Sequence, residues 1–208
     1  MLGRTFRNAV IGGALGAFLM LGAPAAAQTY SEGYKFLEAV KKKDSGEVDK
    51  LLGKPGSTLV NSRDLTTGRT ALHIVVEMRD RQWLAFLTGR GANPNLADNR
   101  GVTPLMRASQ LGFVEGVEAL LRAKARVDDS NDAGESPLIL AVHRRDTQMM
   151  RVLLTAGADP DRTDNSGRSA RDYARMEGAD SVTLAEIERS AQSAGERRAS
   201  GQVYGPSI

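Results

Sequence analysis

The stretch GVTPLMRASQLGFVEGVEALL, residues 101–121, recurs along the chain and decides the fold. The glycines that open it and its copies are Gly68, Gly101, Gly134 and Gly167, and each difference (101 − 68, 134 − 101, 167 − 134) is 33 residues. A Thr or Ser follows two positions behind each of these glycines. A fixed period of this length is typical of a stack of repeated units, in which each unit buries its apolar face against its neighbours.

The four-residue segments that begin two positions after these glycines carry a second signal. They read TALH at 70–73, TPLM at 103–106, SPLI at 136–139 and SARD at 169–172. In period and in wording they resemble the ankyrin repeat, whose motif is T-P-L-H-x-A on a period of 33. The resemblance covers residues 34–179. It implies an all-α fold, an ankyrin-repeat solenoid of stacked helix-turn-helix units with short β-hairpin tips.

The repeat domain extends over residues 34–188, with units at about 34–66, 67–99, 100–132 and 133–165 and a capping unit at 166–188. The Thr or Ser of each unit is placed to cap a first helix by accepting a hydrogen bond from a free backbone N–H. Pro104 and Pro137 take the first helical position, where a missing N–H costs nothing. We expect Leu72, Leu105 and Leu138 in the core.

The last unit has polar residues where the earlier units are apolar. One period after Leu138, Met150 and Leu153 stand Arg171, Thr183 and Glu186. A terminal repeat has only one neighbour, so a polar outer side is expected. Residues 189–208 show no apolar period, and we expect a flexible tail there.

Residues 1–27 are typical of a secretory signal peptide. Arg4 and Arg7 supply a basic start, residues 9–21 are an apolar run, and three alanines at 25–27 offer a cleavage site. The alternative is an uncleaved membrane anchor, which needs about 20 apolar residues and is longer than this run. Cleavage would leave 208 − 27 = 181 residues that begin with a short lead, 28–33. We therefore expect a periplasmic protein, with full secretion as the alternative.

Charge and composition argue against several classes of partner. The signal peptide carries two of the three net positive charges, so the mature chain is at 3 − 2 = +1 and gives no bulk electrostatic case for nucleic acid. The chain has no cysteine, so it has neither disulfides nor a thiol for lipid attachment. We expect a monomer without nucleic acid, without a membrane anchor after cleavage, and stabilised by packing.

The chain offers little material for catalysis. Its two histidines, His73 and His143, lie on different units and at different repeat positions. His73 occupies the motif position, for which we expect a buried, hydrogen-bonded role and not a ligand role. The glycines follow the repeat period and not the spacing of a phosphate-binding loop. We expect no catalytic, metal-binding or cofactor-binding residues, and a hydrolase has no supporting constellation.

Two positions in the middle unit depart from the pattern. Lys124 stands where Gly91 and Gly157 stand, and a left-handed backbone there would cost about 1 kcal/mol. Gly116 lies inside a predicted helix, one period from Trp83 and from Met149. We hypothesise that the side chains of Trp83 and Met149 fill the space beside Gly116. The alternative is that Trp83 is exposed.

Similar repeats hold partner proteins with their hairpin tips and with the inner surface of their first helices. The resemblance therefore implies a strip of partner-binding residues, carried over position by position. The candidates are Arg69, Met78, Asn99, Arg100, Val102, Gln110, Leu111, Asp132, Glu135, His143, Arg144 and Arg168. Mixed charge with a few apolar anchors suits a protein surface better than a polyanion.

These observations together predict an exported, non-catalytic protein–protein interaction module with a periplasmic partner. One alternative is a protective accessory of an exported enzyme, which would form a stoichiometric complex with it. A second alternative is a secreted effector that acts in another cell. Cell fractionation separates the alternatives, because recovery from the medium or from a host favours the effector.

Overall fold

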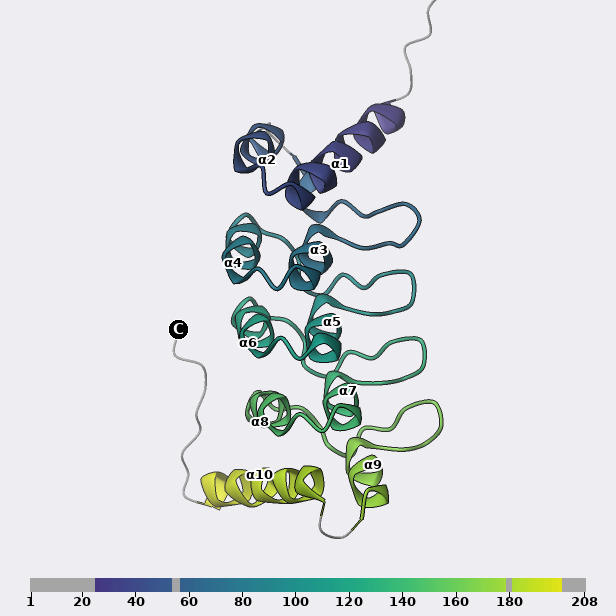
Figure 1. Cartoon of the computed structure of the whole chain (residues 1–208), viewed down its shortest axis with the longest axis vertical. Helices are drawn as coiled ribbons and strands as arrows, with labels where there is room; N and C mark the ends of the chain where they lie inside the picture. Colours follow the sequence, from purple (N-terminus) through teal and green to yellow (C-terminus); the bar gives the residue numbers. More distant parts are fainter. Residues whose placement is uncertain (1–24, 54–56, 179–180, 200–208) are drawn as a thin grey trace, which may run out of the picture.

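The computed structural model describes residues 25–53, 57–178 and 181–199. Most of the predicted signal peptide, residues 1–24, and the end of the predicted tail, residues 200–208, lie outside the described residues. Within the described ranges the chain forms ten α-helices and one 3-10 helix (Figure 1). In chain order they are α1 (Ala25–Lys41), α2 (Ser45–Leu52), η1 (Leu59–Asn61), α3 (Ala71–Glu77), α4 (Arg81–Gly89), α5 (Pro104–Leu111), α6 (Val114–Arg122), α7 (Pro137–His143), α8 (Thr147–Thr155), α9 (Ala170–Met176) and α10 (Val182–Ala199).

The helices form pairs that stack in a single row, with long loops projecting from the side of the odd-numbered helices (Figure 1). Each of α1, α3, α5 and α7 contacts the next odd-numbered helix, while α4, α6 and α8 contact the next even-numbered one. One apolar cluster runs through the whole row. The all-α stack of paired helices confirms the predicted fold class.

The projecting loops are the predicted hairpin tips. The first and last tips close with isolated antiparallel bridges, Arg63 to Thr70 and Thr163 to Ser169. Neighbouring tips are joined by backbone hydrogen bonds, for example from Asp132 N to Arg100 O at 3.1 Å. Gly101 has φ +73°, and a Cβ there would lie 2.8 Å from Asp132 Oδ1. The periodic glycine is therefore required both by its left-handed backbone and by the close approach of the next tip.

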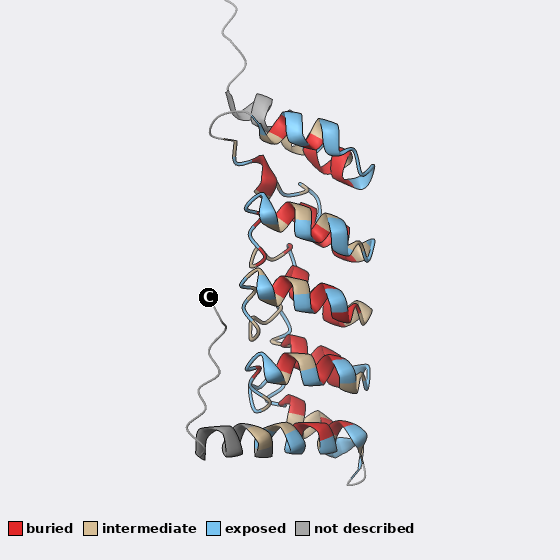
Figure 2. Cartoon of the chain, turned by 90° about the vertical axis from the view of Figure 1, so that its left-hand side faces the viewer, coloured by how far each residue is buried: buried red, intermediate tan, exposed pale blue. Residues whose placement is uncertain are grey.

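The core follows the repeat period. Leu72, Leu105 and Leu138 are at most 1% exposed, which confirms their predicted positions. The second helices add Leu120 and Leu153, which are fully buried. The buried residues of successive helices therefore form one continuous seam, while their exposed residues face outward (Figure 2).

The helix caps explain the Thr and Ser signal. Thr103 Oγ1 accepts from Met106 N, and Ser136 Oγ accepts from Ile139 N, both at 3.3 Å. In the first full unit His73 takes part as well, because its Nδ1 accepts from Thr70 N at 3.1 Å. His73 Nε2 lies 2.9 Å from the carbonyl oxygen of Val102 in the next unit, so Nε2 carries the proton. His73 is 1% exposed, and this confirms the buried, hydrogen-bonded role.

The space beside Gly116 is filled by a different side chain from those we predicted. A Cβ at Gly116 would lie 2.2 Å from Cδ1 of Phe113. Phe113 takes the N-cap position of α6, at which α4 has Asp80, and it makes no side-chain cap bond there. The Phe113 ring therefore occupies the space that the missing side chain of Gly116 leaves within the same unit. The hypothesis that Trp83 and Met149 fill this space is wrong.

Residues with a left-handed backbone follow both helices of a unit. Lys124 has φ +66°, so the lysine does stand in a left-handed position, as the comparison with Gly91 and Gly157 indicated. At the end of the first helices, Arg79 and Arg145 are also left-handed, where the middle unit has Gly112. Their side chains reach the following unit: Arg79 donates to the Leu111 carbonyl, and Arg145 pairs with Glu177 at 3.2 Å.

At both ends of the described part of the chain, helices extend further than the sequence suggested. α1 begins at Ala25 and includes the predicted lead, residues 28–33. α10 continues to Ala199, through residues for which we expected a flexible tail. Its last turns are rich in Ala, Glu and Arg, which are strong helix formers even without an apolar face.

Two of the three polar residues named for the capping unit, Thr183 and Glu186, are buried, while Arg171 is half-buried, and this differs from the predicted polar outer side. Thr183 is fully buried and Glu186 is 2% exposed. Glu186 accepts two hydrogen bonds from Arg151 of α8, at 2.9 and 3.0 Å. The Arg151 guanidinium holds the pKa of Glu186 below its usual range. The cap therefore uses polar side chains as internal contacts with its one neighbour.

Candidate partner-binding surface

The first helices of the units are α3, α5, α7 and α9. We define the inner strip as the tips, the residue before the N-cap of each first helix, and the inner side and end of each first helix. Two contacts show that these parts of the repeat lie together. Arg69 Nη1 is 3.0 Å from Glu77 Oε1, and Glu135 Oε1 is 3.6 Å from His143 Nδ1. Both contacts join residues eight positions apart, since 77 − 69 and 143 − 135 both equal 8. The residue before the N-cap of a first helix therefore lies against the last turn of that helix.

A three-residue ion cluster occupies the strip at α3 and α5. Glu77 Oε1 pairs with Arg69 and also with Arg107, whose Nη2 lies at 2.7 Å and whose Nε lies at 2.9 Å. Arg107 Nη1 also donates to Gln110 Oε1 at 3.3 Å. The three charged side chains are 28–29% exposed. The cluster is thus partly exposed to solvent, and its two arginines and one glutamate give it a net charge of 2 − 1 = +1.

At α7 and α9 the strip has a carboxylate–amide contact, a pair of rings and a tyrosine–carboxylate bond where α3 and α5 have the ion cluster. Glu135 accepts from Asn131 Nδ2 at 2.8 Å. The rings of His143 and Tyr173 meet edge to face, with centroids 4.6 Å apart. The Tyr173 hydroxyl donates to Asp164 at 2.6 Å, and this bond is the main cause that holds the pKa of Asp164 well below its usual range.

Arginines bind the carboxyl ends of the first helices. Arg144 Nη1 donates to the carbonyl oxygen of Gln110 at 3.1 Å, from the end of α7 to the end of α5. Its guanidinium lies over Gly112, where a Cβ would be 2.8 Å from Nη2. Arg79 approaches the same end of α5 from the preceding unit, because it donates to the Leu111 carbonyl from the end of α3. Cations at helix carboxyl ends complement the partial negative charge of the free carbonyls.

The structure leaves most of the twelve candidate residues accessible. Exposed residues are Met78, Asn99, Arg100, Asp132, His143, Arg144 and Arg168, while Arg69, Gln110, Leu111 and Glu135 are half-buried. Val102 is the exception, since it is 5% exposed and packs with Met106 and Leu140 in a small separate cluster. Val102 was expected to be exposed, and this expectation is wrong because the neighbouring first helices supply an apolar lining beneath the tips.

Sequence reasoning missed Arg107 and Tyr173, which lie in the same strip. Arg107 stands one period before Leu140 and one period after Ile74, and Tyr173 follows Leu140 by another period. An arginine at a position that is otherwise apolar or aromatic was therefore a signal available in the sequence. Its meaning depended on the partner Glu77, which the contact across two repeats reveals.

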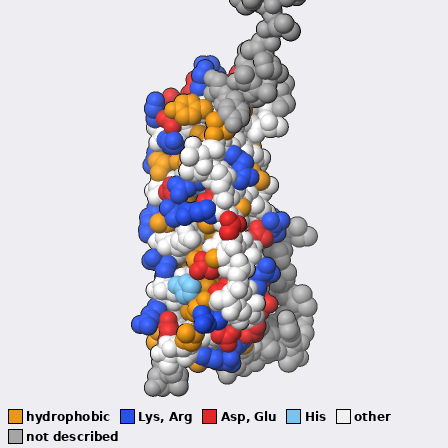
Figure 3. Space-filling model, turned by 90° about the vertical axis from the view of Figure 1, so that its right-hand side faces the viewer, with side chains coloured by type: hydrophobic (Ala, Val, Ile, Leu, Met, Phe, Trp, Pro, Cys, Tyr) orange, Lys and Arg blue, Asp and Glu red, His pale blue; other side chains and the backbone are white. Residues whose placement is uncertain are grey.

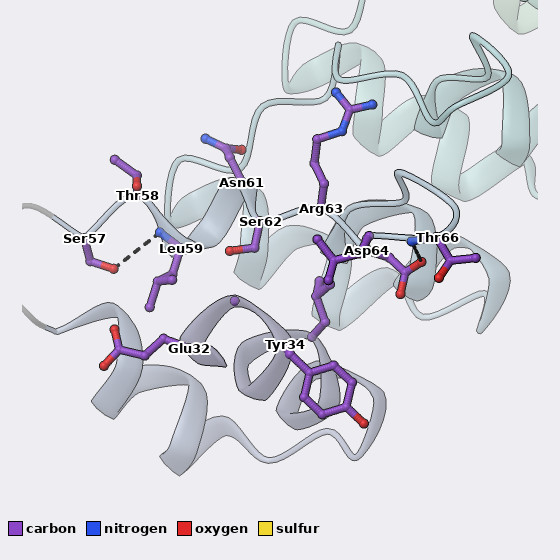
Figure 4. Close-up of a pocket in the computed structure, with 13 residues that line it drawn as sticks. Glu32, Tyr34, Ser57, Thr58, Leu59, Asn61, Ser62, Arg63, Asp64 and Thr66 are labelled. Carbon is purple, nitrogen blue, oxygen red and sulfur yellow. Dashed lines mark hydrogen bonds between the residues drawn. The ribbon is translucent and has the colours of Figure 1, made fainter. Parts of the chain in front are cut away.

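Figure 3 shows the tip side of the molecule, with a group of blue Lys and Arg side chains over the middle of the stack. A separate hollow of about 740 Å³ lies near the N-terminal end, between α1 and the loop through η1 (Figure 4). Tyr34 and Leu37 of α1, Leu59 of η1 and Leu65 of the first tip contribute its apolar lining. None of the twelve candidate residues lines this hollow.

No group of three or more His, Cys, Asp or Glu side chains in the described part of the chain is placed to hold a metal ion. Among the helices of residues 25–53, 57–178 and 181–199, none is long and apolar enough to cross a membrane.

Comparison with known proteins identifies the repeat. A family model described as ankyrin repeats (3 copies) matches residues 36–131, and one described as ankyrin repeats (many copies) matches residues 120–174. Together they cover residues 36–174, more than half of the chain. Ankyrin repeats are typically non-catalytic and imply a protein–protein interaction module.

Individual relatives agree with the family match. An ankyrin repeat-containing protein of Treponema pallidum (strain Nichols) is 34% identical over 110 residues, which are 52% of this chain and 37% of the relative. An ankyrin repeat protein of fowlpox virus (strain NVSL) is 32% identical over 117 residues, 54% of this chain and 34% of the relative. Neurogenic locus notch homolog protein 1 of Danio rerio is 36% identical over 121 residues, 57% of this chain and 5% of the relative. The matched part of the chain therefore covers at most 37% of the length of any of these three relatives.

Proposed function

Because the chain belongs to the ankyrin repeat family, we propose that it is an exported, non-catalytic module that binds a periplasmic protein through its inner strip. The signal-peptide pattern of residues 1–27 supports export. The repeats support protein binding, and we propose the inner strip as the surface that contacts the partner.

One observation carries the proposal. The regular apolar residues of the repeats are buried in the seam, whereas the strip offers charged side chains that are ordered by contacts within and between units. Arg144 is fixed by the Gln110 carbonyl, and Arg69 and Arg107 are fixed by Glu77. Side chains that are already held in place lose less conformational entropy when a partner binds. Exposed Met78 adds an apolar anchor at the end of α3.

The proposal is tested by affinity purification of the full chain from the periplasm. The test variant carries Arg100→Ala, Leu111→Ala and Arg144→Ala, all in the inner strip. The matched control carries Arg81→Ala, Glu118→Ala and Arg122→Ala, which are exposed on α4 and α6. We expect a stoichiometric partner with the wild type and the control, and its loss with the test variant at an unchanged fold by circular dichroism. Retention of the partner by the test variant would discard the inner strip.

The two alternatives make different predictions in the same cells. A protective accessory would co-purify with an exported enzyme whose activity falls when the gene for this protein is deleted. A secreted effector would be recovered mainly from the medium or from a host cell. Recovery in the periplasm without an enzyme among the bound proteins favours the interaction module proposed here.

A further inference from the structure

The charges of the inner strip are unevenly distributed along the stack. We define the basic half as the strip positions at α3 and α5 together with Arg144, whose guanidinium binds at the end of α5. Its charged residues are Arg63, Asp64, Arg69, Glu77, Arg79, Asp98, Arg100, Arg107 and Arg144. Six arginines therefore stand against three acidic residues, which leaves 6 − 3 = 3 positive charges in excess. The strip positions at α7 and α9 hold Asp132, Glu135, Arg145, Asp164, Arg168 and Glu177, which leaves 4 − 2 = 2 negative charges in excess.

The arginines of the basic half have hydrogen-bonding capacity to spare. Two guanidinium groups carry ten N–H donors between them. Those of Arg69 and Arg107 meet the two oxygens of Glu77 and the side-chain oxygen of Gln110. The remaining donors face a region that is partly open to solvent. Arg100, at the tip, is exposed and adds a further cation.

Apolar side chains lie between these cations. Met78 at the end of α3 is 37% exposed, and Leu111 at the end of α5 is half-buried. The Arg79 guanidinium binds the Leu111 carbonyl, so charged and apolar groups alternate along this edge. A ligand that fits both has carboxylates and at least one apolar side chain. Single-stranded nucleic acid fits poorly, because it is bound largely by stacking on aromatic rings, and the strip positions at α3 and α5 have none.

We propose that the basic half binds an acidic segment of the partner protein, whose carboxylates meet Arg69, Arg100 and Arg107 and whose apolar side chain packs on Met78 and Leu111. This inference rests on the proposed function and names the chemistry of the partner. Arginine binds carboxylates in a forked geometry that a lysine does not reproduce. Since screening acts over about 8 Å at physiological ionic strength, the half at α7 and α9, whose net charge is negative, contributes little to this recognition.

The test uses fluorescently labelled synthetic peptides of one length, measured by fluorescence anisotropy with the full chain. The probes alternate Leu with Glu, with Gln or with Lys, and a fourth alternates Glu with Ser. We expect the Glu–Leu probe to bind about tenfold more tightly than the Gln–Leu and Glu–Ser probes. Raising the salt concentration should weaken the Glu–Leu probe most. Equal binding of the Glu–Leu and Gln–Leu probes, or the tightest binding of Lys–Leu, would overturn the inference. Tighter binding of labelled oligo(dT) would also overturn it and assign the surface to polyanions.

Variants locate the effect. The double variant Arg69→Gln and Arg107→Gln should bind the Glu–Leu probe about tenfold more weakly. The matched control, Arg145→Gln and Arg168→Gln, removes the same charge from the other half and should change binding less than about twofold. Arg100→Gln is a second test variant, because this exposed tip residue has no role in the core. Equal loss in the control would indicate a diffuse attraction and contradict the assigned site.

The outcomes separate this inference from the proposed function. If a periplasmic partner is lost from the Arg100, Leu111 and Arg144 variant but retained by the Arg69 and Arg107 double variant, the inner strip binds protein and the acidic chemistry is wrong. If both variants retain the partner, the proposed site itself is wrong.

Discussion

The seam between α6 and α8 and the seam between α8 and α10 exclude water by different chemistry. In the first, Val117 and Leu120 belong to the same apolar cluster as Met149 and Leu153, and all four are fully buried. In the second, the position equivalent to Leu153 is Glu186, whose carboxylate is held by Arg151. The helices of an inner unit bury apolar side chains against neighbours on both sides, whereas the last unit contributes Ile187 to this cluster and adds an ion pair at its one interface.

The polar seam is possible because every buried group in it has a partner. Thr183 Oγ1 donates to Glu177 at 2.8 Å, and Glu186 also pairs with Arg189 at 3.1 Å. Arg151 and Arg189 remain more than half exposed, so their charges stay in contact with water. Buried carboxylates are tolerated when they are paired and hydrogen-bonded. Apolar packing and polar pairing should therefore respond differently to mutation and to pH.

The largest effect is expected from breaking the apolar interior. Leu105→Ala removes a fully buried side chain of α5 and should lower the free energy of unfolding by about 2–5 kcal/mol. Because each unit contacts only its neighbours, both flanking interfaces should weaken. Urea unfolding followed by circular dichroism measures this, with Leu65→Ala as the control, since Leu65 is 60% exposed. An unchanged midpoint for Leu105→Ala would show that the assigned register is wrong.

Breaking the polar seam should have a smaller effect, and its sign should depend on the replacement. Replacement of Glu186 by either Ala or Leu removes the ion pair with Arg151, but Glu186→Ala also leaves a cavity at a buried position and should lower the melting temperature, by less than Leu105→Ala does. Glu186→Leu restores the residue type of the inner units and should leave the melting temperature level or raise it. Calorimetry distinguishes the two. If Glu186→Leu proves as harmful as Glu186→Ala, the carboxylate is needed for more than filling this seam.

The ion pair also predicts an acid-sensitive cap. The folded-state pKa of Glu186 is lowered, so its contribution is present above the unfolded pKa of about 4.3 and is lost as the pH falls through the folded pKa. Below pH 4.3 the wild type should therefore lose stability more steeply than Glu186→Leu. Parallel curves of unfolding free energy against pH would contradict the role of the pair.

His73 places a second pH response between the first two full units. Burial lowers the pKa of His73, so the neutral ring stabilises the fold above the unfolded pKa of about 6.5. This contribution is lost as the pH falls below 6.5 toward the folded pKa, by at most about 1.4 kcal/mol for each pH unit. The slope of unfolding free energy between pH 7.5 and 5.5 should be smaller in His73→Asn than in the wild type. Equal slopes would mean that the bond from Thr70 N to His73 Nδ1, which only the neutral ring can accept, does not contribute to this pH response.

The smallest effect is a local gain in stability. Lys124 has φ +66° and is exposed, so Lys124→Gly should relieve about 1 kcal/mol of backbone strain. The matched control is Gly157→Lys, which introduces the same strain at φ +94° in the next unit and should be destabilising. Thermal unfolding of both variants measures the contrast. A fall in melting temperature for Lys124→Gly would show that the lysine side chain has a stabilising contact.

The sequence predicted those features that repeat with the period. The spacing of the glycines and the caps at Thr103 and Ser136 led directly to the stacked helices and to the buried leucines. The left-handed Lys124 could be predicted as well, because two glycines mark the same position in other units. Each of these predictions depends only on one residue compared with its equivalents.

Features that depend on pairs across units could not be predicted in this way. Phe113 fills the space at Gly116, and Glu77 joins Arg69 to Arg107. Neither contact can be predicted from one residue compared with its equivalents in the other units. Glu186 looked like a surface residue because a terminal unit was expected to be polar outside. Its burial depends on Arg151 of the preceding unit. The inner strip was therefore predicted as a set of positions, while its charge pattern required the structure.

The most direct test of protein binding through the inner strip is site-specific photocrosslinking in cells. A photoreactive amino acid replaces Arg100 at a tip or, in a second strain, Arg122 on α6, and both positions are exposed. The account predicts that irradiation yields one discrete adduct from position 100 and none from position 122. An adduct from position 122 alone, or equal adducts from both positions, would contradict it.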